Sequence, residues 1–549
     1  MSATTTRAQP TDGDLGWPLQ RAAALRGDAT AIIDGGRTVS YRELARRVDG
    51  LGAGLDSLTV GHGGRVGFLG VNSLAHVECT LGVPAHGRVL VDLNLRLTEA
   101  ELAFIADDCG IEALIVDRAR LALGRALRAR CQRLDELVLD DSDEGGGASP
   151  EEVLGYERLV AALPAPPPAE PIDQPAPAEP IDQHSPAAIS YTGGTTGTPK
   201  GVILSHGNLL SNARHNLIAT GHSAADTWLH VCPMFHVAGT ANVLACTWVG
   251  ARQVITPRFE AAAVVDALVA ERVTHVALVP TMISMLLDEL RRRPHERLAS
   301  LRHVQYAASP ITPEVQRELL QRLDCEVVQF YGMTEAAPTV TRLGGEDHRR
   351  GATGLEPHAR RLRSIGTPVV GVQTRVVGAD GEPAPTGEVG ELWVRGPNVM
   401  LGYWRRPDAT AAALAGGWYR TGDAVRSDDN GYLYLVDRLK DMIITGAENV
   451  YCIEVEAALS EHPAVREAAV FGIPDIRWGE AVHAVVRVTA PDAVSSSELI
   501  EHCRARIAGY KLPRSIEISD EPLPRSAAGK LLKNPLREPF WAGGERRVN

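Results

Sequence analysis

Glycine, threonine and lysine crowd residues 189–202, which read ISYTGGTTGTPKGV. Glycine lets a backbone approach an anion closely and aim its N–H groups at it, while hydroxyls add donors and lysine adds a point charge. The run is not a Walker A loop, because Gly197 is followed by Thr-Pro-Lys and not directly by Lys. We therefore expect a polyphosphate-binding loop outside the P-loop NTPases. Its candidate ligands are Thr192, Gly193, Gly194, Thr195, Thr196, Gly197 and Lys200.

Lysine is rare in this chain, which has five lysines among its 56 basic residues. Lysine carries a compact charge on a flexible stem that the planar guanidinium of arginine does not imitate, so a retained lysine is a candidate for chemistry. Lys200 lies in the glycine-rich run, and Lys440, Lys511 and Lys530 lie in VDRLKD, GYKLP and PRSAAGKLLK. Lys533 has no such assignment, and we expect it to be a solvated surface residue.

Three further runs, QFYGMTE (329–335), YRTGD (419–423) and PRSAAGKLLK (524–533), accompany the glycine-rich loop. Together they resemble motifs of the adenylate-forming superfamily, which contains acyl-CoA synthetases, luciferases and the adenylation domains of peptide synthetases. The resemblance covers roughly residues 20–540 and is to the acyl-CoA synthetase, or fatty-acid–CoA ligase, branch. It implies an enzyme that uses ATP and Mg²⁺ to convert a carboxylate into an acyl adenylate and pyrophosphate.

The same resemblance implies roles for the matched residues. In the implied mechanism, Lys530 neutralises the charge that builds up when the carboxylate attacks the α-phosphorus. His236, in LHVCPMFHVAG, borders the acid, and Lys440 is the hinge about which a small domain rotates. The implied nucleotide contacts are adenine on Tyr331 and Gly332, phosphate on Thr334, Mg²⁺ on Glu335 and Thr195, ribose on Asp423 and Arg438, and a pocket turn at Ala308 and Ser309.

Coenzyme A is the expected acceptor of the acyl group. DIRWGE (475–480) and GYKLP (509–513) are similar to segments of acyl-CoA ligases, which implies CoA contacts at Trp478, Lys511 and Gly446. Two positions depart from the ligase pattern, because Ala447 replaces a glycine and Cys452 replaces a proline. A CoA-independent enzyme, such as an amide-forming ligase, therefore stays open, as does a non-catalytic acyl- or nucleotide-binding relative. Phe235, Ala238, Gly239, Tyr306 and Gln329 join His236 as pocket candidates, and their mostly apolar character suits a fatty or an aryl acid.

The fold class expected from pattern and resemblance is α/β. Helical stretches alternate with short apolar strands such as 65–69 and 326–330, whereas 373–377 and 391–395 resemble strands of an antiparallel β subdomain. We expect an N-terminal adenylate-forming domain over 1–437, made of two α/β subdomains and the β subdomain, and a mobile α+β lid over 438–549. The Pro-rich segment 164–186, which contains PAEPIDQ twice, is expected to be a surface loop within the first domain.

Composition excludes several classes of protein. A net charge of −12 does not suit a nucleic-acid partner, and no apolar run is long enough to cross a bilayer. The eight cysteines are scattered, which argues against a disulfide scaffold and fits a reducing cytoplasm. The expected partners are therefore small molecules, namely a carboxylic acid, ATP and CoA, and a homodimer is left open.

Overall fold

The computed structural model describes residues 13–142, 153–161, 181–192, 199–307, 311, 313–438, 441–445, 448–475, 477–490, 493–525 and 531–541. They group into two compact units. Unit 1 draws on Met1–Leu362, Pro368–Gln373 and Arg395–Gly417, and unit 2 on Arg363–Thr367, Thr374–Val394 and Trp418–Asn549. The expected boundary between residues 437 and 438 stays a prediction.

The first sheet of unit 1 is mainly parallel. Its Val- and Ile-rich strands are buried, as is usual for parallel strands covered by helices. Antiparallel strands pair at both ends of the run, β15 with β14 and β2 with β1. The order is β15 (Thr339–Leu343), β14 (Glu326–Gly332), β13 (His303–Tyr306), β12 (His275–Leu278), β10 (Thr227–His230), β11 (Arg252–Ile255), β1 (Thr30–Asp34) and β2 (Arg37–Ser40).

The second sheet of unit 1 is antiparallel at one end, where β9 (Lys200–Ser205) pairs with both β8 (Pro186–Thr192) and β19 (Gly402–Tyr403), and the glycine-rich run joins β8 to β9 in the sequence. Its other pairings, from β8 to β7, are parallel. The order is β19 (Gly402–Tyr403), β9 (Lys200–Ser205), β8 (Pro186–Thr192), β4 (Val89–Asp92), β3 (Arg65–Leu69), β5 (Ile111–Asp117), β6 (Glu136–Asp140) and β7 (Leu154–Gly155).

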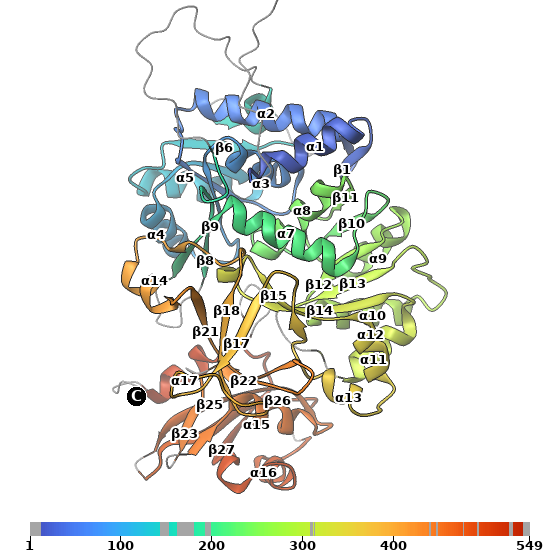
Figure 1. Ribbon diagram of the computed structural model, residues 1–549, viewed down its shortest axis with the longest axis vertical. Coiled ribbons are helices and arrows are strands. Elements are labelled where there is room, and N and C mark those ends of the chain that lie inside the picture. Colours follow the sequence, from blue (N-terminus) through green and yellow to red (C-terminus); the bar gives the residue numbers. More distant parts are fainter. Residues whose placement is uncertain are drawn as a thin grey trace, which may run out of the picture. The chain divides into compact units, whose positions relative to one another are not determined.

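Helices cover both sheets of unit 1, and three apolar clusters form its core. Figure 1 shows α10 and α11 beside β12 to β14, whose side chains share one of these clusters. The longer helices are α1 (Gly16–Arg26), α2 (Tyr41–Ser57), α3 (Leu74–Ala85), α4 (Glu99–Cys109), α5 (Leu121–Arg130), α7 (His206–Thr220), α8 (Val237–Val249), α9 (Ala261–Ala270), α10 (Pro280–Arg292), α11 (Pro313–Arg322) and α12 (Gly345–Ala352).

Unit 2 holds an antiparallel group of strands and an α+β body with its own apolar core. The first group contains β17 (Gln373–Val377), β18 (Gly390–Arg395), β21 (Trp418–Ser427) and β22 (Leu433–Arg438). The body contains β23 (Ile443–Thr445), β24 (Glu448–Val450), β25 (Val465–Asp475), β26 (Gly479–Val488) and β27 (Ser515–Ser519), with α15 (Cys452–Ser460), α16 (Ser496–Arg504) and α17 (Asn534–Trp541).

The α/β class and the antiparallel character of the middle strands are confirmed. The expected strands 65–69 and 373–377 coincide with β3 and β17. Most of the Pro-rich segment lies outside the described residues. Within the part of the chain that the structure describes, no helix is long and apolar enough to cross a membrane.

Candidate active site

The glycine-rich run joins β8 to β9. Thr192 and Lys200 are register partners at the loop end of this hairpin, and residues 193–198 between them lie outside the described residues. The Lys200 ammonium lies 5.3 Å from the centroid of the Tyr403 ring. Among the described residues Lys200 makes no ion pair, so its positive charge is available to an anion.

The QFYGMTE run forms the end of β14 and the turn into β15. Gly332 pairs with Thr339, and a Cβ atom at position 332 would lie only 1.7 Å from the carbonyl oxygen of Pro338. Only glycine therefore fits this turn. Tyr331, Gly332, Thr334 and Glu335 are each half-buried. Polar groups at the carboxyl end of a sheet strand are in the usual place for ligand contacts in α/β folds.

Glu335 is held by a segment that sequence reasoning missed. Its carboxylate accepts a hydrogen bond from the Tyr403 hydroxyl (Oη–Oε1 3.0 Å), and its backbone carbonyl accepts one from Met400 N–H (2.9 Å). Tyr403 lies on β19, which pairs with β9. The structure thus brings together Lys200 and Glu335, two predicted site residues that are 135 positions apart in the sequence, through one tyrosine.

The predicted acid-pocket segment leads into α8. His236 precedes this helix, and its ring centroid lies 4.5 Å from that of Phe235. The segment bends back on itself, since Gly239 N–H donates to the carbonyl of His236 (2.7 Å) and a Cβ at position 239 would lie 2.6 Å from the Cα of Met234. His236 is half-buried and Ala238 is exposed.

Tyr306 and Gln329 lie side by side on β13 and β14, and both are buried. The Tyr306 hydroxyl is 3.2 Å from Gln329 Oε1, 3.0 Å from His348 Nε2 and 3.2 Å from Gln316 Nε2. Burial raises the pKa of this phenol. The Tyr306 hydroxyl thus lies within hydrogen-bond distance of Gln329 and of two neighbouring side chains.

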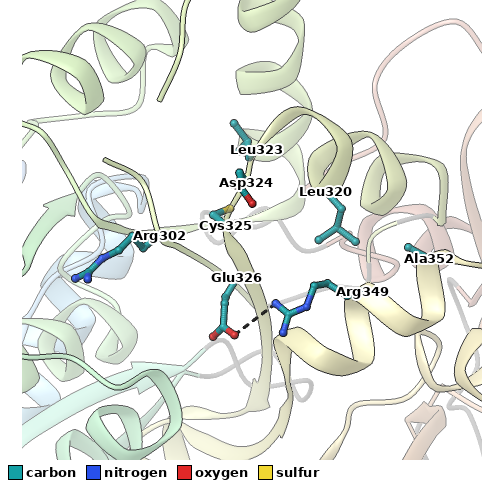
Figure 2. A pocket seen from close by; sticks show the side chains of 8 residues that line it. All are labelled: Arg302, Leu320, Leu323, Asp324, Cys325, Glu326, Arg349 and Ala352. Carbon is teal, nitrogen blue, oxygen red and sulfur yellow. Dashed lines mark hydrogen bonds and ion pairs between the residues drawn. The ribbon is translucent and has the colours of Figure 1, made fainter. Parts of the chain in front are cut away.

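A hollow of about 350 Å³ lies at the start of β14, at the other end of this strand from Tyr331 and Gly332. It is lined by Arg302, Leu320, Leu323, Asp324, Cys325, Glu326, Arg349 and Ala352. Figure 2 shows Arg349 reaching towards Glu326, and the two side chains form a 3.5 Å ion pair. Glu326 is the first residue of β14, whereas Tyr331 and Gly332 are its last, so this hollow is separate from the motif residues.

The predicted ribose contacts meet in unit 2. Asp423 on β21 and Arg438 on β22 are register partners, and Arg438 Nε lies 3.4 Å from Asp423 Oδ1. Asp423 is buried and Arg438 is 45% exposed. The backbone before Asp423 is fixed, because Thr421 donates to the carbonyl of Leu392 (2.7 Å). The YRTGD run thus presents one oriented carboxylate beside one guanidinium.

The predicted CoA contacts, Trp478 and Lys511, have different surroundings. The guanidinium carbons of Arg477 and Arg514 lie 4.9 and 5.6 Å from the Trp478 ring centroid. Lys511 instead forms a two-oxygen ion pair with Glu454 (2.7 and 2.8 Å). Burial alone would lower the pKa of Lys511, but Glu454 outweighs it and raises that pKa. The charge of Lys511 is therefore already balanced within unit 2.

The expectation that Lys533 is a solvated surface residue is wrong. Its side chain is only 14% exposed, and its ammonium lies 2.7 Å from Glu456 Oε1. Glu456 also accepts a hydrogen bond from the backbone N–H of Val470 (2.8 Å). A lysine is buried in this way when a carboxylate compensates for the lost hydration.

The remaining predicted residues lie outside the described residues, namely Gly193, Gly194, Thr195, Thr196, Gly197, Ala308, Ser309, Lys440, Gly446, Ala447 and Lys530.

No three His, Cys, Asp or Glu side chains converge to hold a metal ion in the ranges that the structure describes. A Mg²⁺ ion that is bound mainly through nucleotide phosphates needs only one or two protein carboxylates. Glu335 offers a carboxylate whose second oxygen is not used by Tyr403 in the 3.0 Å hydrogen bond. The donor set therefore fits a nucleotide-bound Mg²⁺.

Two sequence profiles match this chain. The profile described as AMP-binding enzyme matches residues 19–404, and the profile described as AMP-binding enzyme C-terminal domain matches residues 454–530. These ranges include the glycine-rich run, the QFYGMTE turn and the C-terminal lysine-bearing run as far as Lys530.

Several known proteins are similar to this chain over nearly its whole length and theirs. A feruloyl-CoA synthase of Amycolatopsis sp is 38% identical over 532 residues, which is 95% of this chain and 98% of that protein. An indoleacetate–CoA ligase of Aromatoleum aromaticum is 36% identical and covers 95% of this chain and 97% of its own. The solved structure of o-succinylbenzoate CoA synthetase from Bacillus subtilis with its acyl-adenylate intermediate has a TM-score of 0.80 and 30% identity, covering 94% of this chain and 97% of that one.

Proposed function

The chain belongs to the AMP-binding enzyme family and is an AMP-forming acid–CoA ligase, and from this premise we propose that its acid is an aryl carboxylic acid. The observation that carries the proposal is full-length similarity to ligases named for feruloyl and indoleacetate groups. The segment 229–239 supports it, because it has no acidic or basic residue besides histidine and places the Phe235 ring beside His236. Such a surface suits a flat, apolar ring.

The reaction proceeds in two displacements. First, the carboxylate oxygen of the acid bonds to the α-phosphorus of ATP, and the bond from that phosphorus to pyrophosphate breaks. Second, the CoA sulfur bonds to the acyl carbon, and AMP leaves. No general base is needed in the first step, because the attacking carboxylate is already ionised, so the enzyme contributes orientation and charge stabilisation.

We assign roles in the first displacement to the motif residues. Lys200, Thr192 and the loop between them bind the phosphates, and Glu335 holds Mg²⁺ with Thr195. Mg²⁺ would neutralise phosphate charge when bound. The nucleoside contacts are Tyr331, Gly332, Ala308 and Ser309 for adenine, and Asp423 and Arg438 for ribose. Thr334 contacts phosphate, His236 borders the acid, and Lys530 stabilises the charge on the reacting oxygens.

The second displacement uses groups of unit 2. We assign the anionic end of CoA to Trp478 with Arg477 and Arg514, because these two guanidiniums flank its ring. Lys511 is the weaker candidate, since Glu454 already neutralises it. Gly446 is proposed to border the pantetheine arm, and Lys440 to be the hinge between the two steps.

A substrate comparison tests the acid class. Purified enzyme with ATP, Mg²⁺ and CoA is given hydroxycinnamic acids, indoleacetic acid, octanoic acid and palmitic acid, and pyrophosphate release and thioester mass are measured. We expect kcat/KM to be at least about tenfold higher for the best aryl acid, which corresponds to roughly 1.4 kcal/mol of transition-state discrimination. A fatty acid that matches or exceeds the aryl acids would refute the assignment.

The acceptor has its own test. Aryl-CoA formation with CoA-dependent release of AMP is the expected result. Pyrophosphate release without a thioester, together with coupling to an added amine, would instead support the amide-forming alternative. Ala447→Gly then distinguishes the causes, because a large gain in CoA turnover would identify the alanine methyl as the obstacle.

We also propose that the enzyme acts in the cytoplasm, since all eight cysteines are free thiols, as is usual in a reducing compartment. A homodimer is left open, and light scattering of the purified protein would test it.

A further inference from the structure

A short segment, Asn398–Trp404, is hydrogen-bonded to both phosphate-site motifs of unit 1. On one side, the Asn398 amide donates to the carbonyls of Ala336 (2.7 Å) and Thr339 (2.9 Å), which belong to the QFYGMTE turn and the strand after it. Asn398 is fully buried, so these bonds are shielded from water. We call this segment the strap.

The other side of the strap binds β9, the strand that begins at Lys200. Leu401 N–H donates to the carbonyl of Ile203 (3.0 Å), and Trp404 N–H donates to the carbonyl of Gly201 (2.7 Å). The strap therefore links β9, which begins at Lys200, to the turn that carries Glu335.

Tyr403 is the strap residue whose side chain contacts both groups. Its hydroxyl donates to Glu335 (3.0 Å), and its ring centroid lies 5.3 Å from the Lys200 ammonium. Its own N–H donates to the Thr410 hydroxyl (2.9 Å), which fixes the backbone that aims the ring. One tyrosine therefore contacts both a cation and an anion, and the structure shows no ion pair between these two described groups.

The two contacts of Tyr403 leave both Glu335 and Lys200 able to bind a further group. A hydrogen bond to one carboxylate oxygen of Glu335 orients the group and leaves the second oxygen for a cation. A ring face attracts an ammonium without cancelling its charge, unlike a carboxylate. Both groups consequently keep the charge that a magnesium–nucleotide complex requires.

We propose that Tyr403 is a positioning residue that keeps Lys200 and Glu335 apart and aims them at the phosphates and the magnesium ion of the nucleotide. The proposal rests on the proposed function, because that function assigns phosphate to Lys200 and Mg²⁺ to Glu335. Tyr403 acts through these two groups and touches no reacting atom.

The test measures the Mg²⁺ dependence of ATP–pyrophosphate exchange with whichever acid the wild type accepts. Tyr403→Phe removes only the hydrogen bond, and we expect the Mg²⁺ concentration for half-maximal exchange to rise about tenfold, as for one lost hydrogen bond to a charged group. Tyr403→Leu also removes the ring, and we expect the KM for ATP to rise as well. Thioester formation from supplied acyl adenylate should not change in either variant.

Tyr434 supplies a matched control in unit 2. Its hydroxyl also donates to a carboxylate, Asp428 (3.0 Å), and an arginine, Arg426, lies over its ring at 4.9 Å. Tyr434→Phe removes the same kind of bond away from the motifs, so the Mg²⁺ requirement should stay at the wild-type value. An equal shift in both tyrosine variants would overturn the proposal.

A double variant separates this proposal from the proposed function. In a Glu335→Gln background, Tyr403→Phe should add no further Mg²⁺ effect, because its partner has already lost its charge. A full additional shift would overturn the role of Tyr403. If Glu335→Gln alone leaves the Mg²⁺ requirement unchanged, the assignment of Mg²⁺ to Glu335 fails instead. In either case, a Tyr403→Phe variant with the wild-type Mg²⁺ requirement refutes the positioning role.

Discussion

Replacing Lys533 with methionine should destabilise unit 2 substantially. The Lys533–Glu456 pair is 2.7 Å long with side chains only 14% and 18% exposed, and the methionine would leave Glu456 without its cation. Burial raises the pKa of Glu456, and the lysine charge opposes that rise. Breaking a buried pair by removing one partner costs about 3–5 kcal/mol. Because Val470 N–H still donates to Glu456, we expect the lower end of that range.

Urea unfolding of the full chain, followed by hydrogen exchange of peptides from β25 and β26, measures this loss in the unit concerned. Lys511→Met is the control, since the Lys511–Glu454 pair has the same 2.7 Å length but its glutamate is 39% exposed. Lys511 itself is 18% exposed, so the contrast lies in the glutamate, and a pair with this more exposed member should contribute nearer the about 0–1 kcal/mol of surface pairs. Equal losses in the two variants, or a loss below about 1 kcal/mol in Lys533→Met, would refute the reasoning from burial.

Three further predictions concern pH and the motifs. Burial lowers the pKa of both His275 and His303 to about 4. The stability that their neutral forms contribute is therefore present above pH 6.5 and is lost as the pH falls towards 4. Tm should drop across this window in a fluorimetric pH series, and His275→Gln should flatten the drop. Gly332→Ala, whose Cβ would overlap the Pro338 carbonyl, should lower ATP–pyrophosphate exchange at least about tenfold, whereas Gly61→Ala, which meets no atom within 4 Å, should not. Lys530→Ala should abolish most adenylation but spare thioester formation from supplied acyl adenylate; equal loss of both steps would contradict its role.

Local sequence was sufficient to predict the fold class and several of the strands. The strands 65–69 and 373–377 are predictable because each is a short apolar or alternating run between segments with turn residues. Asp423 and Arg438 are brought together because they are register partners on two adjacent antiparallel strands, β21 and β22. In each of these cases the information lies within about 20 residues.

The contacts of Tyr403 and Lys533 could not be predicted in this way. Tyr403 meets Glu335 across 68 positions of sequence, and that meeting depends on the pairing of β19 with β9. Lys533 is buried only because Glu456 and the backbone of β25 are placed beside it. Such long-range contacts depend on tertiary packing, which composition and spacing do not encode locally. A short run with two aromatic residues directly after a glycine, Gly402-Tyr403-Trp404, was the one available signal for the strap.

The path of the chain between its two units limits how the protein can be made or divided. The chain passes from one unit to the other after Leu362, Thr367, Gln373, Val394 and Gly417. A fragment that stops at Leu362 would contain Lys200 and Glu335 but would lack the strap. During synthesis, Tyr403 can therefore contact Lys200 and Glu335 only after the strap, which ends at Trp404, has been made. A split version of the enzyme, or a fusion to unit 1 alone, should keep the chain intact to at least Gly417.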